Sequence, residues 1–575
     1  MTTLFDAVIR GGMVIDGSGS PARRADVAID AGKIVRVGQV PEKGREEIDA
    51  SGQLVTPGFV DIHTHYDGQV TWEHRLMPSS NHGVTTVVAG NCGVGFAPCK
   101  PHQRDTLVRV LEGVEDIPEI VMTEGIPWNW ETFPEYLDSI AGRHYDIDFA
   151  AHVPHSAIRV YVMGERGERR EAATPDDLRQ MTQIVRDAVR AGAIGVSSSH
   201  HVGHRAVDGE LAPSVGSHGD EIRALAQGLR EAGGGVFQMI TDGYYGNSNP
   251  EAQMALLRSI AETSGGPVSY SLIQKAHIAD VPQKMLDLTR QAQADGLRIK
   301  AQVYPRPTGV LYSLSLSLHP FRFHPSYLEI HPLPLDQRIA AMREPARRAA
   351  ILSEKPEHTN PISLMLVQNY GNSFALGDPP NYEPAADQLL SAMAQARGID
   401  VAELAYDMLL EGNGNALLLN PVSNFAAGNA DAVRMMLADE NTLIGLGDGG
   451  AHYGMICDSS FPTSMLTDWT RDRGEGRFTV EWAIHRLTRN NAMAVGLTDR
   501  GLIAPGMKAD INVIDYERLR LHPPRPVFDL PAGGRRLTQV ADGYTATLVS
   551  GEVTYRNGIA TDALPGRLVR VGATA

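Results

Sequence analysis

The stretch GFVDIHTH, residues 58–65, is a short apolar run that ends in two histidines. Seven similar runs follow it: VTTVVAGN (84–91), DFAAHVPH (148–155), AIGVSSSH (193–200), GVFQMITD (235–242), PVSYSLIQ (267–274), IKAQVYPR (299–306) and TLIGLGDG (442–449). Runs of this length are typical of strands that are covered on both faces, as in parallel sheets. Amphipathic helical stretches such as residues 174–192 separate them. The pattern predicts an α/β fold, a (β/α)₈ TIM-like barrel over residues 58–504. A doubly wound open sheet is the alternative, which eight strands and the missing Gly-rich nucleotide loop disfavour.

The two ends of the chain are rich in expected short strands. Residues 6–17 (DAVIRGGMVIDG) and 543–558 (GYTATLVSGEVTYRNG) alternate apolar with polar residues and break at glycine. We therefore expect a small β-sandwich domain built from both termini, residues 1–57 plus 505–575. Two separate caps are the alternative.

A long insertion, residues 307–441, separates the seventh run from the eighth. It is too long for one connection between a strand and a helix. Because barrel active sites form at the carboxyl ends of the strands, the insertion is expected on the active face, as a substrate lid or wall. An oligomer contact is the alternative. Its aromatic residues would suit a bulky apolar substrate; they include Tyr312, Phe321, Phe323 and Tyr327.

Composition limits the class of partner and the compartment. The 575 residues include 52 basic and 68 acidic side chains, a formal net charge of −16. Binding of nucleic acid needs a basic face, so we expect no nucleic-acid partner. Three cysteines cannot build a disulfide framework, which indicates a reducing compartment. No signal peptide or bilayer-spanning stretch is recognisable, so we expect a cytoplasmic protein without a membrane partner. A homo-oligomer remains open.

The first run carries the strongest chemical signal. Side chains at i and i+2 of a strand lie on the same face, so His63 and His65 are aimed together into the barrel mouth. Neutral imidazoles in such a pair suit zinc. Asp448, at the end of the last run, is the carboxylate expected opposite them. It could ligate the metal and take a proton from bound water. His452 follows on the same loop and could orient water or substrate.

Other polar residues are expected at the mouth only because they lie near the carboxyl end of a predicted strand. Cys92, after the second run, could be a thiolate ligand or only a small buried apolar residue. The remaining candidates lie within or directly after runs four to seven: His200, His201, Gln238, Gln274, Lys275, Tyr304 and Arg306.

Four segments together resemble a known family: PGFVDIHTHYD (57–67), GVTTVVAGNCGVG (83–95), LGDGGAH (446–452) and GLIAPGMKADINVIDYERL (501–519). They are similar to the metal-dependent amidohydrolase superfamily, and within it to the N-acyl-D-amino-acid deacylase (D-aminoacylase) branch. The resemblance implies that His63, His65 and Cys92 are metal ligands and that Asp448 is the catalytic acid/base. It also implies that Lys275 and Tyr304 contact the carboxylate of the substrate.

The sequence departs from the branch at two strands. The deacylases place one histidine on strand five and one on strand six, where this chain has VFQMITDG and VSYSLIQKAH. Gln238 and Gln274 could supply amide oxygens, although amides suit zinc poorly, or His200 and His201 could complete the ligand sphere. We expect zinc, with one ion favoured over two.

Three functions remain open at this stage. The first is metal-dependent hydrolysis of a C–N amide bond in an N-acyl-amino-acid, a small-molecule substrate. Its charged carboxylate would be held by Lys275 or Arg306. The second keeps the site but changes the substrate to a cyclic amide, imide or lactone, or a bulky aromatic amide. The third is a non-catalytic binding protein on the same scaffold, against which His63, His65, Cys92 and Asp448 together argue.

Overall fold

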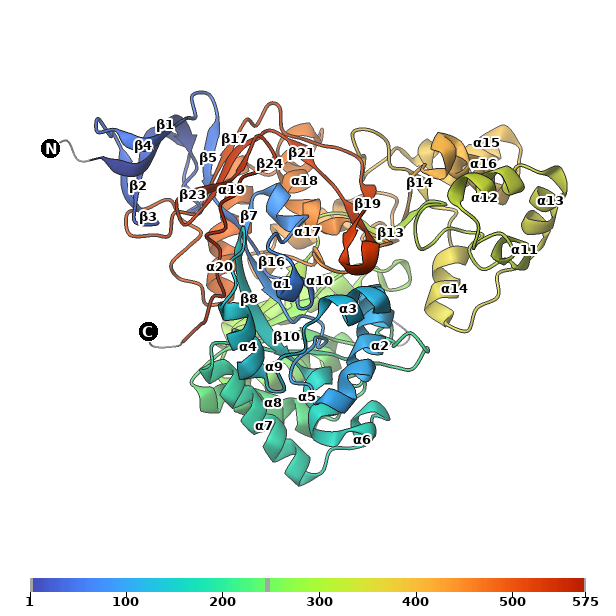
Figure 1. Ribbon diagram of the computed structural model, residues 1–575, viewed down its shortest axis with the longest axis horizontal. Helices are drawn as coiled ribbons and strands as arrows, with labels where there is room; N and C mark the ends of the chain where they lie inside the picture. The colour runs from blue at the N-terminus through green and yellow to red at the C-terminus, as the bar shows by residue number, and fades with distance from the viewer. Residues whose placement is uncertain (1–3, 243–248, 573–575) are drawn as a thin grey trace.

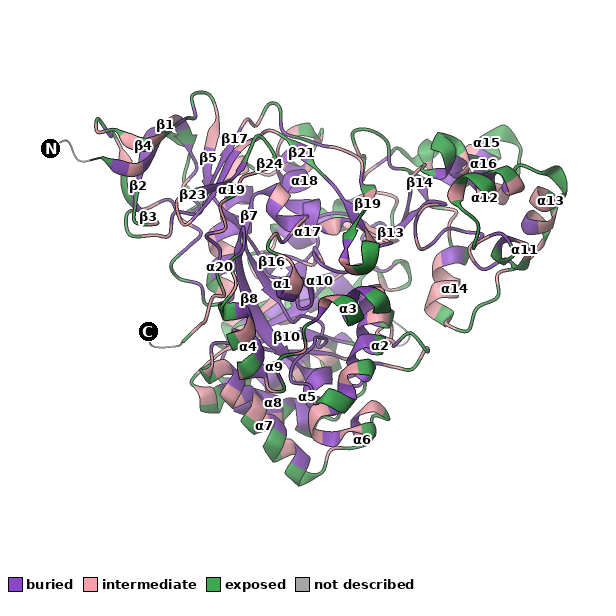
Figure 2. Cartoon of the chain, in the orientation of Figure 1, coloured by how far each residue is buried: buried purple, intermediate pink, exposed green. Residues whose placement is uncertain are grey.

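The computed structural model describes residues 4–242 and 249–572 and contains an eight-stranded parallel barrel sheet at its centre (Figure 1). In sheet order its strands are β6 (Phe59–Asp61), β7 (Val84–Ala89), β8 (Asp148–Pro154), β9 (Gly195–Ser199), β10 (Val236–Ile240), β11 (Val268–Ser271), β12 (Ile299–Val303) and β16 (Thr442–Ile444). Each strand lies within one of the eight apolar runs. Nearly all of their residues are buried, as Figure 2 shows, because helices cover the outer face. The predicted barrel is confirmed.

The segments that follow the first and last strands bring the two edges of the sheet together. The backbone N–H of His65 donates to the carbonyl of Gly449 at 2.7 Å, and that of Asp448 donates to the carbonyl of His63 at 3.2 Å. Thr64 and Gly449 form a parallel bridge. The barrel is therefore nearly closed at the point where the expected metal ligands lie.

Helices pack around the barrel between its strands. The main ones are α2 (Arg104–Glu115), α4 (Phe133–Ala141), α5 (His155–Met163), α7 (Pro175–Arg190), α8 (Gly219–Ala232), α9 (Pro250–Ser264), α10 (Val281–Ala294), α17 (Asp431–Ala438), α18 (Phe461–Thr467) and α19 (Val480–His485). Helix α7 illustrates how the sequence sets the start and the buried face of these helices. Thr174 and Asp177 form a capping box before its first turn, and Met181, Val185 and Ala188 form the buried stripe.

Strands from both ends of the chain share one nine-stranded sheet. The N-terminal strands are β1 (Phe5–Val14), β2 (Arg23–Asp30), β3 (Lys33–Gly38), β4 (Gly44–Asp49) and β5 (Leu54–Pro57). The C-terminal strands are β17 (Ile511–Ile514), β22 (Tyr544–Val549), β23 (Glu552–Arg556) and β24 (Ile559–Ala560). The two sets meet where β5 pairs antiparallel with β17. Val27, Val55, Ile511 and Leu548 belong to the core of this sheet, so both ends contribute to it.

The C-terminal segment also reaches the barrel. The backbone N–H of Val569 donates to Phe149 of β8 at 2.7 Å, so the end of the described chain runs along the barrel. A hairpin formed by β19 (Arg525–Leu530) and β20 (Gly534–Thr538) lies on the side of the insertion.

The insertion forms a separate lobe, at the right of Figure 1. It holds a three-stranded sheet of β13 (Thr308–Tyr312), β14 (Phe374–Ala375) and β15 (Leu418–Ser423). Its helices are α11 (Pro325–Leu328), α12 (Leu335–Met342), α13 (Pro345–Ser353), α14 (Pro361–Gln368), α15 (Leu390–Arg397) and α16 (Val401–Leu409). The lobe touches the barrel mouth where the N–H of Leu311 donates to the carbonyl of Met455 at 2.8 Å.

The aromatic residues of the insertion do not form a substrate wall. Tyr312, Phe321, Phe323 and Tyr327 are all buried and pack with the aliphatic side chains of helices α12, α15 and α16. The aromatic composition reflects the need of this lobe for a core of its own, so the interpretation as an apolar substrate surface was wrong.

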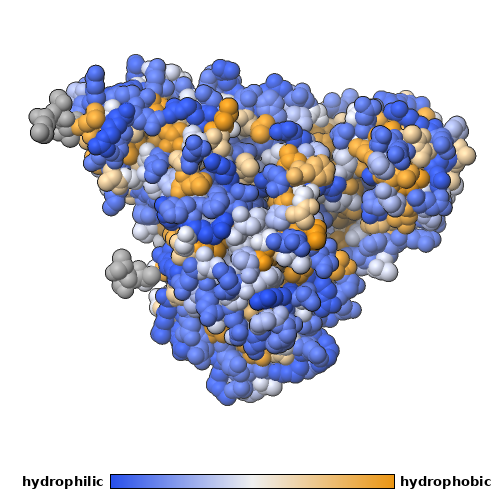
Figure 3. Space-filling model, viewed as in Figure 1, coloured by the Kyte–Doolittle hydropathy of each residue, from blue (hydrophilic) through white to orange (hydrophobic). Residues whose placement is uncertain are grey.

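Hydrophilic residues cover most of the face drawn in Figure 3, with smaller groups of hydrophobic residues among them. No helix in the described ranges combines the length and apolarity needed to cross a membrane.

Candidate metal centre

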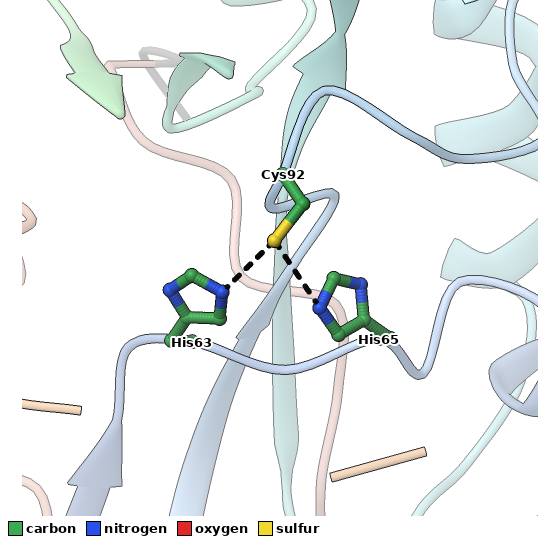
Figure 4. A group of neighbouring side chains, drawn as sticks. All are labelled: His63, His65 and Cys92. Atoms are coloured by element: carbon green, nitrogen blue, oxygen red, sulfur yellow. Dashed lines mark hydrogen bonds between the residues drawn. The ribbon is translucent and has the colours of Figure 1, made fainter. Parts of the chain in front are cut away.

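Three side chains from the ends of the first two barrel strands point toward one another (Figure 4). His63 and His65 follow β6, and Cys92 follows β7. The Sγ of Cys92 lies 3.2 Å from Nε2 of His63 and 3.6 Å from Nε2 of His65. The ligand atoms of the three residues lie within 4.8 Å of one another, and all three residues are buried.

Asp448 adds a fourth donor to this cluster. Its Oδ1 lies 3.4 Å from Nε2 of His63 and 3.6 Å from Nε2 of His65. The same Oδ1 is buried and accepts no hydrogen bond from any residue the structure describes. The three donor residues and Asp448 therefore converge on one point from the ends of β6, β7 and β16.

The donor spacing fits a metal ion. Tetrahedral zinc with bonds of about 2.0–2.3 Å to nitrogen, oxygen and sulfur holds its donors about 3.3–3.6 Å apart. The four measured separations, 3.2, 3.6, 3.4 and 3.6 Å, agree closely with these values. Imidazole, thiolate and carboxylate are also the donor types that zinc prefers. The cluster could therefore hold a metal ion.

The backbone is strained at two of these positions. Cys92 has φ 58° and Asp448 has φ 46°, in the left-handed region that non-glycine residues rarely occupy. The Cys92 conformation is held by its N–H, which donates to Oε1 of Gln238 on β10 at 3.1 Å. Such strain is common at functional sites, where the surrounding structure aims a side chain.

Two further residues orient the histidines. The Nδ1–H of His63 donates to Oε1 of Gln302, on β12, at 2.7 Å, which leaves Nε2 with a lone pair facing Cys92 and Asp448. Glu115, the last residue of α2, places Oε1 3.5 Å from Nδ1 of His65 and Oε2 3.4 Å from Nε2 of His452. Gln302 and Glu115 thus contact Nδ1 of the two imidazoles, on the side opposite the Nε2 atoms that face Cys92.

The electrostatics of the cluster differ between its members. Burial lowers the pKa of His63 to about 4, so its imidazole is neutral at pH 7. Burial opposes protonation of His65 as well, but Glu115 and Cys92 outweigh it and raise the pKa of His65 well above the usual value. Burial raises the pKa of the Cys92 thiol to about 12. Burial works against ionisation of Asp448, yet His65 and His63 hold its pKa well below the usual range. Metal ligation would have to remove protons from His65 and Cys92.

The structure places some of the other sequence-predicted residues away from this cluster. His200 pairs through Nε2 with Ser217 Oγ at 2.9 Å, and Gln274 binds the segment at Asn424. Neither contacts the cluster through any interaction given for the described residues. Gln238 reaches the cluster only through the backbone of Cys92.

Lys275 and His201 lie together near the mouth. His201 packs against His204 with ring centroids 4.9 Å apart, and Lys275 lowers the pKa of His201 after burial, the larger cause. The charges of His65, His452 and Asp448 contribute to the shifted pKa of His204, which places His204 beside the cluster. Burial lowers the pKa of Lys275 to about 8.

Tyr304 and Arg306 belong to a network of their own. The Tyr304 hydroxyl donates to the carbonyl of Asp458 at 3.0 Å and accepts from Nε of Arg306 at 3.0 Å. Arg306 also forms an ion pair with the Asp458 carboxylate at 3.2 Å. Its guanidinium is thus occupied by a carboxylate of the protein, which weakens the prediction that it holds a substrate carboxylate.

Sequence reasoning missed three residues of the site. Gln302 precedes Tyr304 by two positions on the same strand face, so strand phase could have found it. His152, on β8, is buried, and the proximity of His63 contributes after burial to its pKa of about 3. Glu115 carried only a weak signal, an acidic residue in the last helical turn, where the helix dipole disfavours it.

The fold and the cluster together define a barrel protein with converging donor groups of the kind that bind metals, and comparison with known proteins identifies its family. The model of the amidohydrolase family matches residues 46–555, so the chain belongs to the amidohydrolase family. The resemblance inferred from the sequence is confirmed.

Two curated relatives from Alcaligenes xylosoxydans xylosoxydans match parts of the chain. A D-aminoacylase is 33% identical over 195 residues, 34% of this chain and 37% of the relative. An N-acyl-D-aspartate deacylase is 33% identical over 235 residues, 40% of this chain and 42% of the relative. The chain thus matches less than half the length of either relative.

Solved structures match over nearly the whole chain. A crystal structure of D-aminoacylase has a TM-score of 0.65 at 24% identity, covering 98% of this chain and all of the other. The N-acyl-D-glutamate deacylase from Bordetella bronchiseptica, solved with zinc and a phosphonate inhibitor, has a TM-score of 0.65 at 22% identity and covers 99% of this chain and all of the other. At this identity the match shows a shared fold.

Proposed function

We propose that this protein hydrolyses the C–N amide bond of N-acyl-amino acids, with N-acyl-D-amino acids as the substrate class. The observation that carries the proposal is the convergence of Asp448 on His63, His65 and Cys92 at tetrahedral donor spacing. The deacylase relatives support the substrate class.

His63, His65 and Cys92 would hold one zinc ion, and Asp448 would face the position left for water. When bound, the ion would polarise the substrate carbonyl and lower the pKa of a water molecule. One ion is favoured over two because the described residues give one complete set of converging donors. The amide oxygens of Gln238 and Gln274 already accept hydrogen bonds from the backbone N–H groups of Cys92 and Ala426.

Asp448 would move the proton. Its Oδ1 faces both imidazoles and is free of other hydrogen-bond donors among the described residues, so it can accept a proton from the attacking water. Its low pKa, set by His65 and His63 against burial, keeps it ionised for that role at neutral pH. The same carboxyl group would then deliver the proton to the leaving nitrogen.

Lys275 would bind the substrate carboxylate. It is buried beside His201 at the mouth, and at pH 7 a lysine with a pKa of about 8 is mostly protonated. Tyr304 would assist from its place at the end of β12, and His452, held by Glu115, would orient substrate or water.

The free cysteines and charge pattern support a cytoplasmic enzyme acting on small molecules. Cys92, Cys99 and Cys457 are all free and buried, as expected in a reducing compartment. Cell fractionation with an antibody to the protein tests the location, and recovery in a secreted fraction would contradict it.

A substrate panel tests the proposed activity. Purified protein is assayed on N-acetyl-D- and N-acetyl-L-amino acids, hydantoins and lactones. We expect turnover of N-acyl-D-amino acids, with Asp448→Asn lowering kcat by about 10²- to 10⁴-fold. Asp431→Asn, at an exposed position of α17, is the matched control. Hydrolysis of only cyclic substrates, or full activity in Asp448→Asn, would overturn the proposal.

A further inference from the structure

A cavity of about 300 Å³ lies between the inserted lobe and the β19–β20 hairpin, apart from the metal centre. Its walls come from two segments that are far apart in the sequence: residues 314–317, Arg322, His331 and Arg338 of the lobe, and Arg535 of the hairpin. Three guanidinium groups and one imidazole therefore share one small space.

None of these three arginines forms an ion pair within the described part of the chain. Arg338 donates from Nη1 to the carbonyl of Leu314 at 2.9 Å and to the Tyr327 hydroxyl at 3.0 Å. Arg535 donates from Nη2 to Oγ of Ser317 at 3.1 Å and from Nη1 to the carbonyl of Ser315. The one side-chain interaction given for Arg322 with a described residue is a cation–π contact with Phe323, at 5.5 Å. The positive charges are thus held in place without an ion-pair partner within hydrogen-bond distance among the described residues.

Several nitrogens at the cavity lack partners. The Nε atoms of Arg338 and Arg535 and Nδ1 of His331 are buried and form no hydrogen bond to any described residue. Buried donors are nearly always paired in proteins, so such a group of orphaned nitrogens in a roomy cavity calls for a ligand with acceptor oxygens.

The lowered pKa values of the residues around the cavity show that burial and mutual repulsion disfavour their positive charges. Burial lowers the pKa of Arg322, with repulsion from Arg338, and burial also lowers the pKa of Arg535. Burial and then the three arginines lower the pKa of His331 to about 4, so its imidazole is neutral at pH 7. Asp116 faces Arg535 from the barrel side, where its Oδ2 already accepts from the N–H of Gly454 at 3.0 Å. One partly engaged carboxylate does not balance three guanidiniums.

We propose that this cavity is an anion-binding site for the carboxylate or phosphate group of a small molecule. Guanidinium groups bind the oxygens of both groups through charge-assisted hydrogen bonds, which suits an anion with two or more oxygens. His331 would form one further hydrogen bond to the anion through Nδ1, which has no partner among the described residues. The inference stands on the cavity alone and does not depend on the proposed amide hydrolysis.

The site is connected to the loop that follows Asp448. The N–H of Ser317 donates to the carbonyl of Gly454 at 3.1 Å, two residues after His452. A Cβ at Gly454 would lie 1.9 Å from Oγ of Ser317 and 2.8 Å from Nη2 of Arg535, so only glycine permits this close packing. The bound anion would therefore lie against the same loop, as the distal end of a substrate or as a separate ligand.

Calorimetric titration with inorganic phosphate, in low-salt buffer at pH 7, tests the proposal on the full-length protein. We expect binding to weaken by about tenfold or more in Arg322→Gln and in Arg535→Gln, the loss typical of one charge-assisted hydrogen bond. Arg343→Gln, an exposed arginine of the same lobe, should bind as the wild type does. Absence of phosphate binding, or equal binding by all four proteins, would overturn the inference.

Two further measurements complete the test. The thermal midpoint of Arg322→Gln without phosphate should equal or exceed that of the wild type, because the substitution relieves repulsion and removes no hydrogen bond given for the described residues. A large fall in the thermal midpoint would instead assign Arg322 a structural role and contradict the site.

Competition between phosphate and an amide substrate in the wild type, lost in Arg322→Gln, would identify the anion as part of the substrate. Phosphate binding without effect on turnover would identify a separate ligand.

Discussion

The carboxylate of Glu115 lies 3.5 Å from Nδ1 of His65, on the side of the imidazole opposite Cys92 and Asp448. Both residues are almost fully buried, so little solvent screens this contact. A carboxylate in this position fixes the ring and raises its basicity as a ligand. The end of helix α2 is thereby coupled to the end of strand β6.

We expect Glu115→Gln to weaken metal binding by about 10- to 100-fold, since the amide keeps the shape but loses the charge. Competition with a chelating dye measures the affinity. Glu112→Gln, one turn earlier on the same helix, is the control and should bind metal as the wild type does. Equal affinity in the Glu115 and Glu112 variants would show that the contact does not support His65.

Cys92→Ala should remove most of the bound metal, because it deletes the donor that lies 3.2 and 3.6 Å from the two imidazoles. Elemental analysis of the purified protein gives the metal content per chain, expected near one for the wild type. Cys99→Ala is the control, because Cys99 is also free and buried but its Sγ donates to the Lys100 carbonyl. Full metal content in Cys92→Ala would show that Cys92 is only a small buried side chain.

The fold could be predicted from the sequence because apolar periodicity reports burial directly. Each barrel strand lies within one of the eight mainly apolar runs of eight residues, and strand alternation alone predicts that His63 and His65 lie on one face. The residues that contact these histidines could not be predicted in the same way. Glu115 reaches His65 from a helix, through tertiary packing that no local pattern records.

The aromatic insertion shows the same limit. Phe321 and Tyr327 could line a substrate wall or fill a core, and composition does not distinguish the two. The outcome depends on whether the insertion is large enough to need its own core. The three arginines of the cavity are spread over more than 200 positions, and only the folded chain brings Arg322 and Arg338 to Arg535.

The ion pair between Arg500 and Asp148 should contribute strongly to stability. The two groups lie 2.6 Å apart, both 4% exposed, where the segment that precedes β17 meets the first residue of strand β8. Arg500→Met leaves Asp148 with Lys508, 3.0 Å away, as its remaining ion-pair partner among the described residues, and should cost about 1–3 kcal/mol in free energy of unfolding. Urea denaturation measures this. Arg520→Met is the control, because its pair with Asp378 is exposed and should contribute about 0–1 kcal/mol. Equal losses in both variants would contradict the argument.

The last prediction concerns pH and substrate charge. Burial lowers the pKa of Lys275 to about 8, so its ammonium group is lost as the pH rises through 8. If Lys275 holds the substrate carboxylate, KM for an N-acyl-D-amino acid should rise above pH 8, while KM for its methyl ester should stay nearly constant. Lys275→Met should raise KM for the acid by about tenfold or more at pH 7 and should abolish this pH dependence.

Lys284→Met, at an exposed position of α10, provides the control and should leave both substrates unaffected. Steady-state rates between pH 6.5 and about 9, the range that spans the shifted pKa, measure the effect. Equal losses on acid and ester in Lys275→Met would mean that the lysine supports the local structure around His201 and does not bind the carboxylate.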